Sequence, residues 1–262
     1  MRTAVLVACL AAVAACGGSS SPSTPASPTP TATLPAGGVC GALGGPTSIV
    51  NGSECPKVVS TSVVLLNLRN GSGDQAGACS GTVIARRAVL TAAHCVVDAA
   101  GAQVYLGSGT PVTAKSLAAY PGYSEKNNAS VDVGVVLTAT DLGVEPIPLL
   151  LGRDAHVGET AIIAGWGRDQ NTVGTTLRAG LAAITAVNGS LLQTEYTTNA
   201  SSVCQGDSGG PLLLSEGGVW AVAGIISANQ TTSCAYGTNY YTNVRSAAAS
   251  FILEHVPDAA RR

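Results

Sequence analysis

The feature that most constrains the fold of this chain is the recurrence of short strand-like runs along most of its length. They are rich in β-branched residues and are separated by clusters of Gly, Asn, Ser and Pro, a pattern typical of an all-β domain of many short strands. The runs occupy residues 58–68, 80–92, 102–107, 131–138, 159–167, 210–214, 219–227 and 239–244. Only the tail at 244–256 has helical spacing, with Phe251, Ile252 and Val256 available for one buried face. We therefore predict one all-β domain that ends in a helix.

The start of the chain has the character of an export signal. Arg2 precedes an apolar run at 4–15 that is too short to span a bilayer as a mature helix. The run ends in Val-Ala-Ala-Cys-Gly at 13–17, which resembles the lipobox of bacterial lipoproteins, in which the Cys is lipidated and becomes the mature N-terminus. We predict a signal peptide at 1–15, lipidation of Cys16 and export to the bacterial cell envelope. The alternative is an ordinary export signal cut after Ala15, which would give a secreted protein.

The next segment, through residue 38, is dominated by Ser, Pro and Thr and contains nothing that could form a core. We interpret 16–38 as the lipidated Cys followed by a tether. The whole chain of 262 residues has a net charge of −2, and charged residues make up 11% of it. It therefore has no basic field that would attract nucleic acid or an anionic membrane surface, and we expect membrane contact through the lipid only.

The cysteines agree with export. Apart from Cys9 in the signal and Cys16 at the anchor, six remain: Cys40, Cys55, Cys79, Cys95, Cys204 and Cys234. Their number does not settle which of them pair. No C-x-x-C or His-Cys cluster has zinc-binding spacing, so we predict disulfides and neither a metal nor another cofactor.

Three residues stand in sequence contexts that suggest chemistry. His94 lies in TAAHC, Asp132 in VDVGVV and Ser208 in CQGDSGGP. His156 and His255 have no such context, and we interpret them as structural or solvent-facing.

The glycines around Ser208 also match G-x-S-x-G, the nucleophile elbow of α/β-hydrolases. That arrangement needs the order Ser, acid, His, together with alternating strands and helices. After Ser208 the only His is His255, the available acids are Glu216 and the adjacent Glu254, and the chain does not alternate strands with helices. The order His94, Asp132, Ser208 on an all-β pattern suits the chymotrypsin arrangement instead.

From Ile49 to Val256 the chain resembles the trypsin/chymotrypsin-like serine proteases. The motifs that carry the resemblance occur in the family's order: IVNG, LTAAHC, DVGVV, AGWG, GDSGGP, and GIIS before a Cys. The combination of TAAHC with GDSGGP is highly specific. The resemblance implies two packed six-stranded antiparallel β-barrels with the active site between them. It also implies a monomeric serine endopeptidase that acts on proteins or peptides.

The resemblance assigns the catalytic roles. Ser208 is the nucleophile and His94 the general base, a role that suits histidine because its side chain ordinarily titrates near neutrality. Asp132 orients the imidazole and stabilises the imidazolium. The backbone N–H groups of Gly206 and Ser208 form the oxyanion hole.

The resemblance also implies two disulfides, Cys79–Cys95 and Cys204–Cys234. Cys40 and Cys55 then remain, and we pair them by elimination.

In this family, cleavage creates a new N-terminus at the Ile of I-V-x-G, and its ammonium pairs with the Asp before the catalytic Ser. The matching residues are Ile49 and Asp207, so we predict a propeptide at 39–48 and a protease domain at 49–262. Ser48 precedes the cut, which disfavours a trypsin-like activator and suggests a protease that prefers small residues, this one included. The alternative is a constitutive strand that is never cleaved.

Substrate preference follows from the pocket positions that the family pattern assigns. Ser202 stands at the pocket base, six residues before the nucleophile, where an Asp would select Arg or Lys. Asn229 and Asn239 stand on the walls where relatives that accept large side chains have Gly, and Ala228 stands where Trp is common. We expect a preference for Ala, Val, Thr or Leu, with aromatic residues as the second choice.

Two further classes of function compete with the enzyme. A catalytically silent homologue would serve as a binding module, although all three triad positions are intact here. A structural envelope lipoprotein would use the lipid and the tether but has no need of TAAHC or GDSGGP.

Overall fold

The structure is a computed structural model that describes residues 53–54, 60–127, 131–168, 176–197, 200–231, 234 and 236–262. All of these residues lie in one compact unit, Thr31–Arg262. The residues predicted for lipidation, propeptide cleavage and the third disulfide lie outside the described residues: Cys16, Cys40, Ile49 and Cys55.

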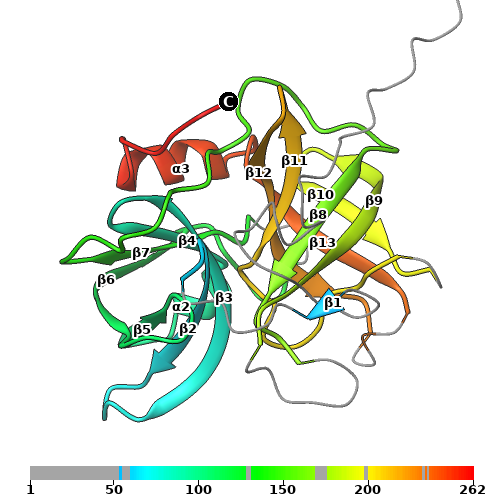
Figure 1. Ribbon diagram of the computed structural model, residues 1–262. Helices are drawn as coiled ribbons and strands as arrows, with labels where there is room; N and C mark the ends of the chain where they lie inside the picture. The colour runs from blue at the N-terminus through cyan, green and yellow to red at the C-terminus, as the bar shows by residue number, and fades with distance from the viewer. Residues whose placement is uncertain are drawn as a thin grey trace, which may run out of the picture. The chain divides into compact units, whose positions relative to one another are not determined.

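The first half of the described chain forms a closed antiparallel barrel in the order β2-β3-β4-β7-β6-β5. Its strands are β2 Val63–Arg69, β3 Gln75–Ala85, β4 Ala88–Thr91, β5 Gly101–Tyr105, β6 Val112–Ala119 and β7 Gly134–Thr138. In β2 the burial alternates along most of the strand, because successive side chains point to opposite faces of the sheet. Figure 1 shows this barrel in cyan and green.

The second half forms another barrel. Its sheet has the order β1-β9-β10-β13-β12-β11-β8, and a β9–β8 pairing closes six of these strands into a ring. The strands are β1 Ser53–Glu54, β8 Thr160–Gly165, β9 Arg178–Asn188, β10 Leu191–Glu195, β11 Pro211–Glu216, β12 Val219–Asn229 and β13 Thr238–Asn243. The two closed six-stranded antiparallel barrels confirm the fold predicted from the sequence.

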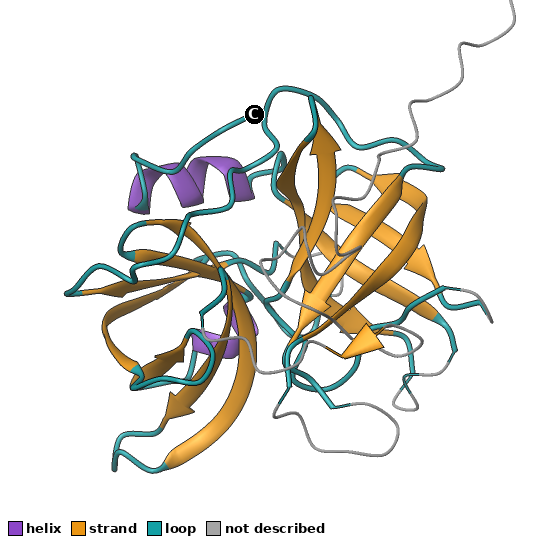
Figure 2. Ribbon diagram, viewed as in Figure 1, coloured by secondary structure: helices purple, strands orange, loops and turns teal. Residues whose placement is uncertain are grey.

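Within the described residues, two short helices accompany the strands (Figure 2). The predicted C-terminal helix is α3, Ala248–His255, and it buries Phe251 and Ile252 as expected. The expectation that only the tail is helical was wrong, because Ala93–Val96 form α2 directly after β4. A single turn has too few residues to show a helical period in the sequence.

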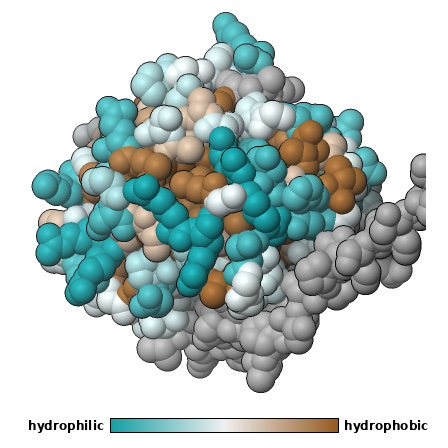
Figure 3. All heavy atoms as spheres, turned by 90° about the horizontal axis from the view of Figure 1, so that it is seen from above, coloured by the Kyte–Doolittle hydropathy of each residue, from teal (hydrophilic) through white to brown (hydrophobic). Residues whose placement is uncertain are grey.

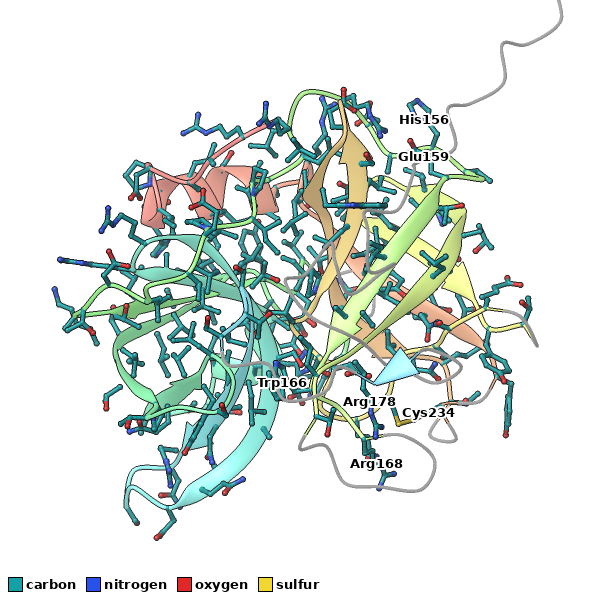
Figure 4. The ribbon with its side chains drawn as sticks, in the orientation of Figure 1. His156, Glu159, Trp166, Arg168, Arg178 and Cys234 are labelled. Carbon is teal, nitrogen blue, oxygen red and sulfur yellow. A yellow bond between two sulfur atoms is a disulfide. The ribbon has the colours of Figure 1, made fainter. Side chains whose placement is uncertain are left out.

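Apolar side chains fill both barrels and the space between them. One cluster of buried residues runs from the first barrel through part of the second to α3, and another fills the rest of the second barrel. Trp166, which follows β8, donates its indole N–H to the carbonyl of Val63 in β2 at 2.8 Å. Figure 4 shows this side chain where the two barrels meet. The barrels therefore hold the segments between them in fixed positions.

The outer surface mixes residue types. On the face drawn in Figure 3, hydrophobic residues occur in several patches that hydrophilic residues separate. No helix among the described residues has the length and apolar character needed to cross a membrane.

Candidate active site

His94 is positioned by the first barrel. Strand β4 is buried throughout and leads into α2, which carries His94. A disulfide joins Cys95, the next residue, to Cys79 in β3. The short helix is therefore attached to the barrel at both the strand and the disulfide, which restricts the movement of the imidazole.

Asp132, in the segment before β7, lies directly against His94. Its Oδ2 is 2.7 Å from His94 Nδ1, and its Oδ1 accepts the backbone N–H of His94 at 3.0 Å. The Ser227 hydroxyl, from β12 of the second barrel, also donates to Oδ2, at 2.6 Å. The carboxylate thus orients the ring through one oxygen and the helix backbone through the other.

These contacts determine the charge of Asp132, whose side chain is 4% exposed. Burial opposes ionisation, but hydrogen bonds from His94 and Ser227 and the attraction of the His94 ring outweigh it, so the pKa of Asp132 lies below its ordinary value. An ionised carboxylate only accepts hydrogen bonds. Nδ1 of His94 therefore carries a proton, and in the neutral ring Nε2 is left as the basic nitrogen.

The backbone around Asp132 is attached to the second barrel. The Thr242 hydroxyl, in β13, accepts the N–H of Asp132 and donates to its carbonyl, both at 3.1 Å. Thr242 is fully buried. A single side chain therefore fixes the position of Asp132 relative to the opposite barrel.

Ser208 lies in a tight loop between Cys204 and β11. The N–H of Asp207 bonds to the Cys204 carbonyl at 3.0 Å, and the N–H of Gly210 bonds to the Asp207 carbonyl at 2.9 Å. Gly206 has a φ of +93°, and a Cβ there would lie 2.9 Å from the Cα of Gly167. Only glycine combines that dihedral with such a close approach.

The two predicted oxyanion donors differ from the other N–H groups of this turn. Among the described residues, neither the N–H of Gly206 nor that of Ser208 makes a hydrogen bond, although the N–H groups of Asp207, Gly209 and Gly210 all do. Backbone donors are rarely left without an acceptor. Two such donors in one turn can bind an anionic oxygen.

The main chain brings Ser208 next to the segment that carries His94. The carbonyl of Ser208 accepts the N–H of Ser80 at 2.8 Å and lies 3.8 Å from Sγ of Cys95. Within the described residues no hydrogen bond joins the Ser208 hydroxyl to the His94 ring. Catalytic hydrogen bonds are often long or poorly aligned in the absence of substrate.

Asp207 is buried beneath this loop, with 3% of its surface exposed. Its Oδ1 accepts the N–H of Gly167 and its Oδ2 accepts the N–H of Cys204, both at 2.8 Å. Burial raises the pKa of Asp207 to about 6, although the two N–H groups and the charge of Arg178 act in the opposite direction. The predicted partner of Asp207, Ile49, lies outside the described residues.

The three predicted pocket residues lie together. Ser202 and Asn239 are fully buried, and the Ser202 hydroxyl donates to Oδ1 of Asn239 at 3.1 Å. Asn229 donates to the same oxygen at 2.6 Å, and Asn239 in turn donates to Thr194 at 3.2 Å. A disulfide joins Cys204 to Cys234, the other pair implied by the resemblance.

A cavity of about 570 Å³ adjoins the His94–Asp132 pair. Residues from both barrels line it, among them His94, Tyr123, Ser227, Ala228, Asn229 and Tyr240. Because Ala228 is small and exposed, this part of the wall is open. The cavity is large enough for side chains of an extended peptide.

Ser227 and Thr242 are site residues to which the sequence interpretation gave no role. Ser227 ends the GIIS motif that contributed to the resemblance, and this motif was the available signal. Thr242 offered no local signal, because its contact with Asp132 joins residues that are 110 positions apart in sequence.

The other histidines lie away from this site. Nδ1 of His255 donates to the Phe251 carbonyl within α3, at 2.9 Å, and His156 is exposed beside Glu159. Figure 4 shows His156 and Glu159 at the opposite end of the second barrel from Arg168 and Cys234. Potential ligand atoms of Cys79, His94 and Cys95 lie within 4.8 Å of one another, but the two sulfurs form a disulfide and are not thiolates.

Two closed six-stranded barrels, with a His–Asp pair on one and a Ser loop on the other, define the chymotrypsin-like class of folds. A solved structure of a protein named HL collagenase has this fold: its TM-score is 0.68 at 22% identity, over 80% of this chain and 99% of that one.

Comparisons of sequence agree with the class. A family model described as Trypsin matches residues 49–252. Phenoloxidase-activating enzyme 1 of Spodoptera litura is 28% identical over 207 residues, which cover 63% of this chain and 55% of that protein. Chymotrypsin of Phaedon cochleariae is 30% identical over 196 residues, covering 63% and 69%. Chymotrypsin-2 of Vespa crabro is 31% identical over 193 residues, covering 64% and 84%.

The chain belongs to the trypsin family. It spans just over half the length of some curated relatives that it matches, such as the Spodoptera protein.

Proposed function

We propose that the protein is a serine endopeptidase that hydrolyses peptide bonds through Ser208, His94 and Asp132. The observation that carries this proposal is the 2.7 Å contact between Asp132 Oδ2 and His94 Nδ1, beside a Ser208 loop with two N–H donors that have no acceptor within the described part of the chain. Membership of the trypsin family supports it.

The reaction follows from these groups. Nε2 of His94 takes the proton of the Ser208 hydroxyl as Oγ bonds to the substrate carbonyl carbon, and the N–H groups of Gly206 and Ser208 stabilise the oxyanion. The C–N bond then breaks, and His94 returns the proton to the leaving amine, which leaves an acyl-enzyme. In the second half of the reaction, His94 takes a proton from water as the water attacks the ester carbon. His94 then returns the proton to Ser208 Oγ as the carboxylic acid is released. Asp132 stays ionised throughout and stabilises the imidazolium.

The pocket supports cleavage after small or medium uncharged residues. Ser202, Asn229 and Asn239 place no carboxylate at its base, so Arg and Lys would find no counter-ion there. The shared hydrogen bonds keep both amides in place and leave little depth for aromatic rings. Ala, Val, Thr or Leu before the cleaved bond is the expected preference.

Activation by cleavage before Ile49 is part of the proposal. A buried carboxylate that accepts only neutral N–H groups is stabilised strongly by a cationic partner. Asp207 accepts two such N–H groups, and the charge of Arg178 acts on it as well. The new ammonium of Ile49 would provide this partner and hold the loop around Gly206. Cys40–Cys55 would keep the propeptide attached after the cut.

Export also belongs to the proposal. The disulfides Cys79–Cys95 and Cys204–Cys234 suit an oxidising compartment. We place the chain outside the cytoplasm, anchored through lipid at Cys16 or secreted after cleavage following Ala15. The relatives named above are insect proteins, so support for a bacterial envelope rests on the signal sequence alone.

The competing function is a silent homologue that only binds other proteins. Such a homologue would be expected to have a damaged site, whereas here His94 contacts Asp132. The N–H groups of Gly206 and Ser208 also have no acceptor in the segments that the structure describes.

One experiment tests the proposal. The exported full-length chain is treated with a fluorophosphonate, and its intact mass is measured before and after reduction, with Ser208→Ala as control. We expect one adduct that the control lacks. We also expect a reduced fragment starting at Ile49 that stays attached to its propeptide until reduction. A chain that starts at Ile49, is folded and takes no adduct would establish the silent homologue. A mass increment on Cys16 separates the lipid anchor from secretion.

A further inference from the structure

Ser80 belongs to the first barrel but makes its contacts with the loop of the second. It lies in β3 next to Cys79 and is fully buried. Its hydroxyl accepts the backbone N–H of Trp166 and donates to the carbonyl of Gly206, both at 2.8 Å. The hydroxyl therefore connects the end of β8 to the loop before the nucleophile.

The backbone of Ser80 is attached to the same loop. Its N–H donates to the carbonyl of Ser208 at 2.8 Å, and its own carbonyl accepts the hydroxyl of Thr91 at 2.8 Å. A Cβ on Gly209 would overlap both the Ser80 carbonyl and Thr91 Oγ1. The loop thus packs against β3 with no space to move toward it.

Two hydrogen bonds orient the peptide groups on either side of Gly206. The carbonyl of Gln205 accepts the N–H of Arg168 at 2.9 Å, and the carbonyl of Gly206 accepts the Ser80 hydroxyl. In a trans peptide the N–H points opposite to the carbonyl, so the first bond directs the Gly206 N–H away from Arg168. Glycine does not restrict these rotations by itself, because it tolerates both signs of φ. Outside hydrogen bonds must therefore select one orientation.

We propose that Ser80 is a positioning residue that holds the oxyanion-binding N–H groups of Gly206 and Ser208 in place. The inference rests on the proposed function. Without the hydroxyl, the Gly206 carbonyl and the buried N–H of Trp166 lose their shared partner. The peptide groups around Gly206 then rotate to find others, and the donor moves away from the oxyanion. Substrate binding in the pocket is unaffected, because Ser202 and Asn239 lie outside this network.

The test compares Ser80→Ala, Ser80→Gly and Ser80→Thr with the wild type, using a peptide p-nitroanilide with Ala before the leaving group. Removing one oxyanion donor typically lowers kcat by about 10²–10³-fold. Because displacing a donor is milder than deleting it, we expect kcat of S80A and S80G to fall by about 10- to 100-fold. KM should stay within about twofold, and S80T, which keeps a hydroxyl, should recover part of kcat. Affinity for a peptide aldehyde, whose adduct places an oxyanion in the hole, should fall with kcat.

Thr138→Val is the matched control, since it removes another buried hydroxyl of the first barrel, one that donates to the Thr140 carbonyl at 2.7 Å. It should lower the melting temperature and leave kcat unchanged. Fluorophosphonate titration counts competent sites, so kcat refers to folded enzyme only. An active wild type with unchanged kcat and aldehyde affinity in S80A and S80G would overturn the inference. Equal losses of kcat in T138V would do the same. An inactive, unlabelled wild type would overturn the proposed function instead.

Discussion

The two barrels differ in what they bring to the site, and each holds the other's contribution in place. The first barrel carries His94 and Asp132, yet Asp132 is bound by the hydroxyls of Ser227 and Thr242 from the second. The second barrel carries Ser208, yet its loop is bound by Ser80 from the first. Each barrel therefore contributes hydrogen bonds that hold a residue of the proposed triad carried by the other. The geometry of the site therefore depends on how the two barrels pack against each other.

The two barrels also bury different chemistry. In the first, the buried carboxylate faces an imidazole and a hydroxyl, whereas the pocket of the second is built from amides and hydroxyls that bond to one another. We infer that changes around the Asp132 carboxylate alter the rate of reaction most, and that changes in the network of Ser202, Asn229 and Asn239 alter stability and selection of substrate. Substitutions in each barrel test this difference.

The largest effect is expected for Asp132→Asn. The amide can donate toward His94 Nδ1, which would favour the tautomer with its proton on Nε2 and leave no base for Ser208. Substitutions of this kind lower kcat by about 10⁴-fold. Steady-state hydrolysis of a peptide p-nitroanilide, with the folded fraction checked by circular dichroism, measures the loss. A loss below about tenfold would mean that His94 does not depend on Asp132 for its tautomer.

A smaller effect, on stability and selection, is expected for Asn239→Ala in the second barrel. The change removes the acceptor that Ser202 and Asn229 share and the amide that donates to Thr194, which keeps its hydrogen bond to the Tyr241 hydroxyl. Each buried group left unsatisfied costs about 1–3 kcal/mol, so we expect a loss of about 2–4 kcal/mol in the free energy of unfolding. Preference should also shift toward Leu and Phe, because the pocket gains depth. Urea denaturation and a panel of peptide substrates measure the two effects.

Asn67→Ala in the first barrel is the matched control for Asn239. Oδ1 of Asn67 is buried and has no hydrogen-bond partner among the described residues. Its removal should therefore change the free energy of unfolding by less than about 1 kcal/mol, or increase it. Equal losses for the two asparagines would show that the hydrogen-bond network of the pocket adds nothing to stability.

The strand-like runs predicted an all-β domain, and the ordered motifs carried the family resemblance that implied the two barrels. The sequence also predicted that His94, Asp132 and Ser208 belong to one site, because chain order excluded the α/β-hydrolase arrangement. These inferences depended on local patterns of a few residues each.

Contacts between segments far apart in the chain could not be predicted in this way. Ser80 and Gly206 are 126 residues apart, and Asp132 and Thr242 are 110 apart, with no local pattern to link them. Such pairs depend on how the barrels pack. The four-residue helix α2 was missed for the opposite reason, because it is shorter than the period that identifies a helix.

The last contrast is between two buried carboxylates. His94 and Ser227 lower the pKa of Asp132, while burial raises that of Asp207 to about 6. An unfolded Asp titrates near pH 3.9, so the folded chain holds the Asp207 proton more tightly than the unfolded chain does. That contribution to stability is fully present below about pH 4 and is lost as the pH rises through 6.

Asp207→Asn removes this titration and should therefore gain stability relative to the parent between pH 4 and 7, by on the order of 2 kcal/mol. The comparison is made on uncut chains in the Ser208→Ala background, so that no self-cleavage supplies an ammonium. Urea unfolding at several pH values measures the difference, in which any pH-independent cost of the Asn cancels. If the free energies of unfolding of the two variants changed with pH in parallel, Asp207 would titrate in the folded chain as it does in the unfolded chain. In a chain that starts at Ile49, the new ammonium should lower the pKa of Asp207. The pH dependence of the stability difference between Asp207 and Asn should then disappear or reverse. The change on cleavage would then identify Asp207 as the carboxylate that gains an ammonium partner only on activation, whereas Asp132 already contacts His94.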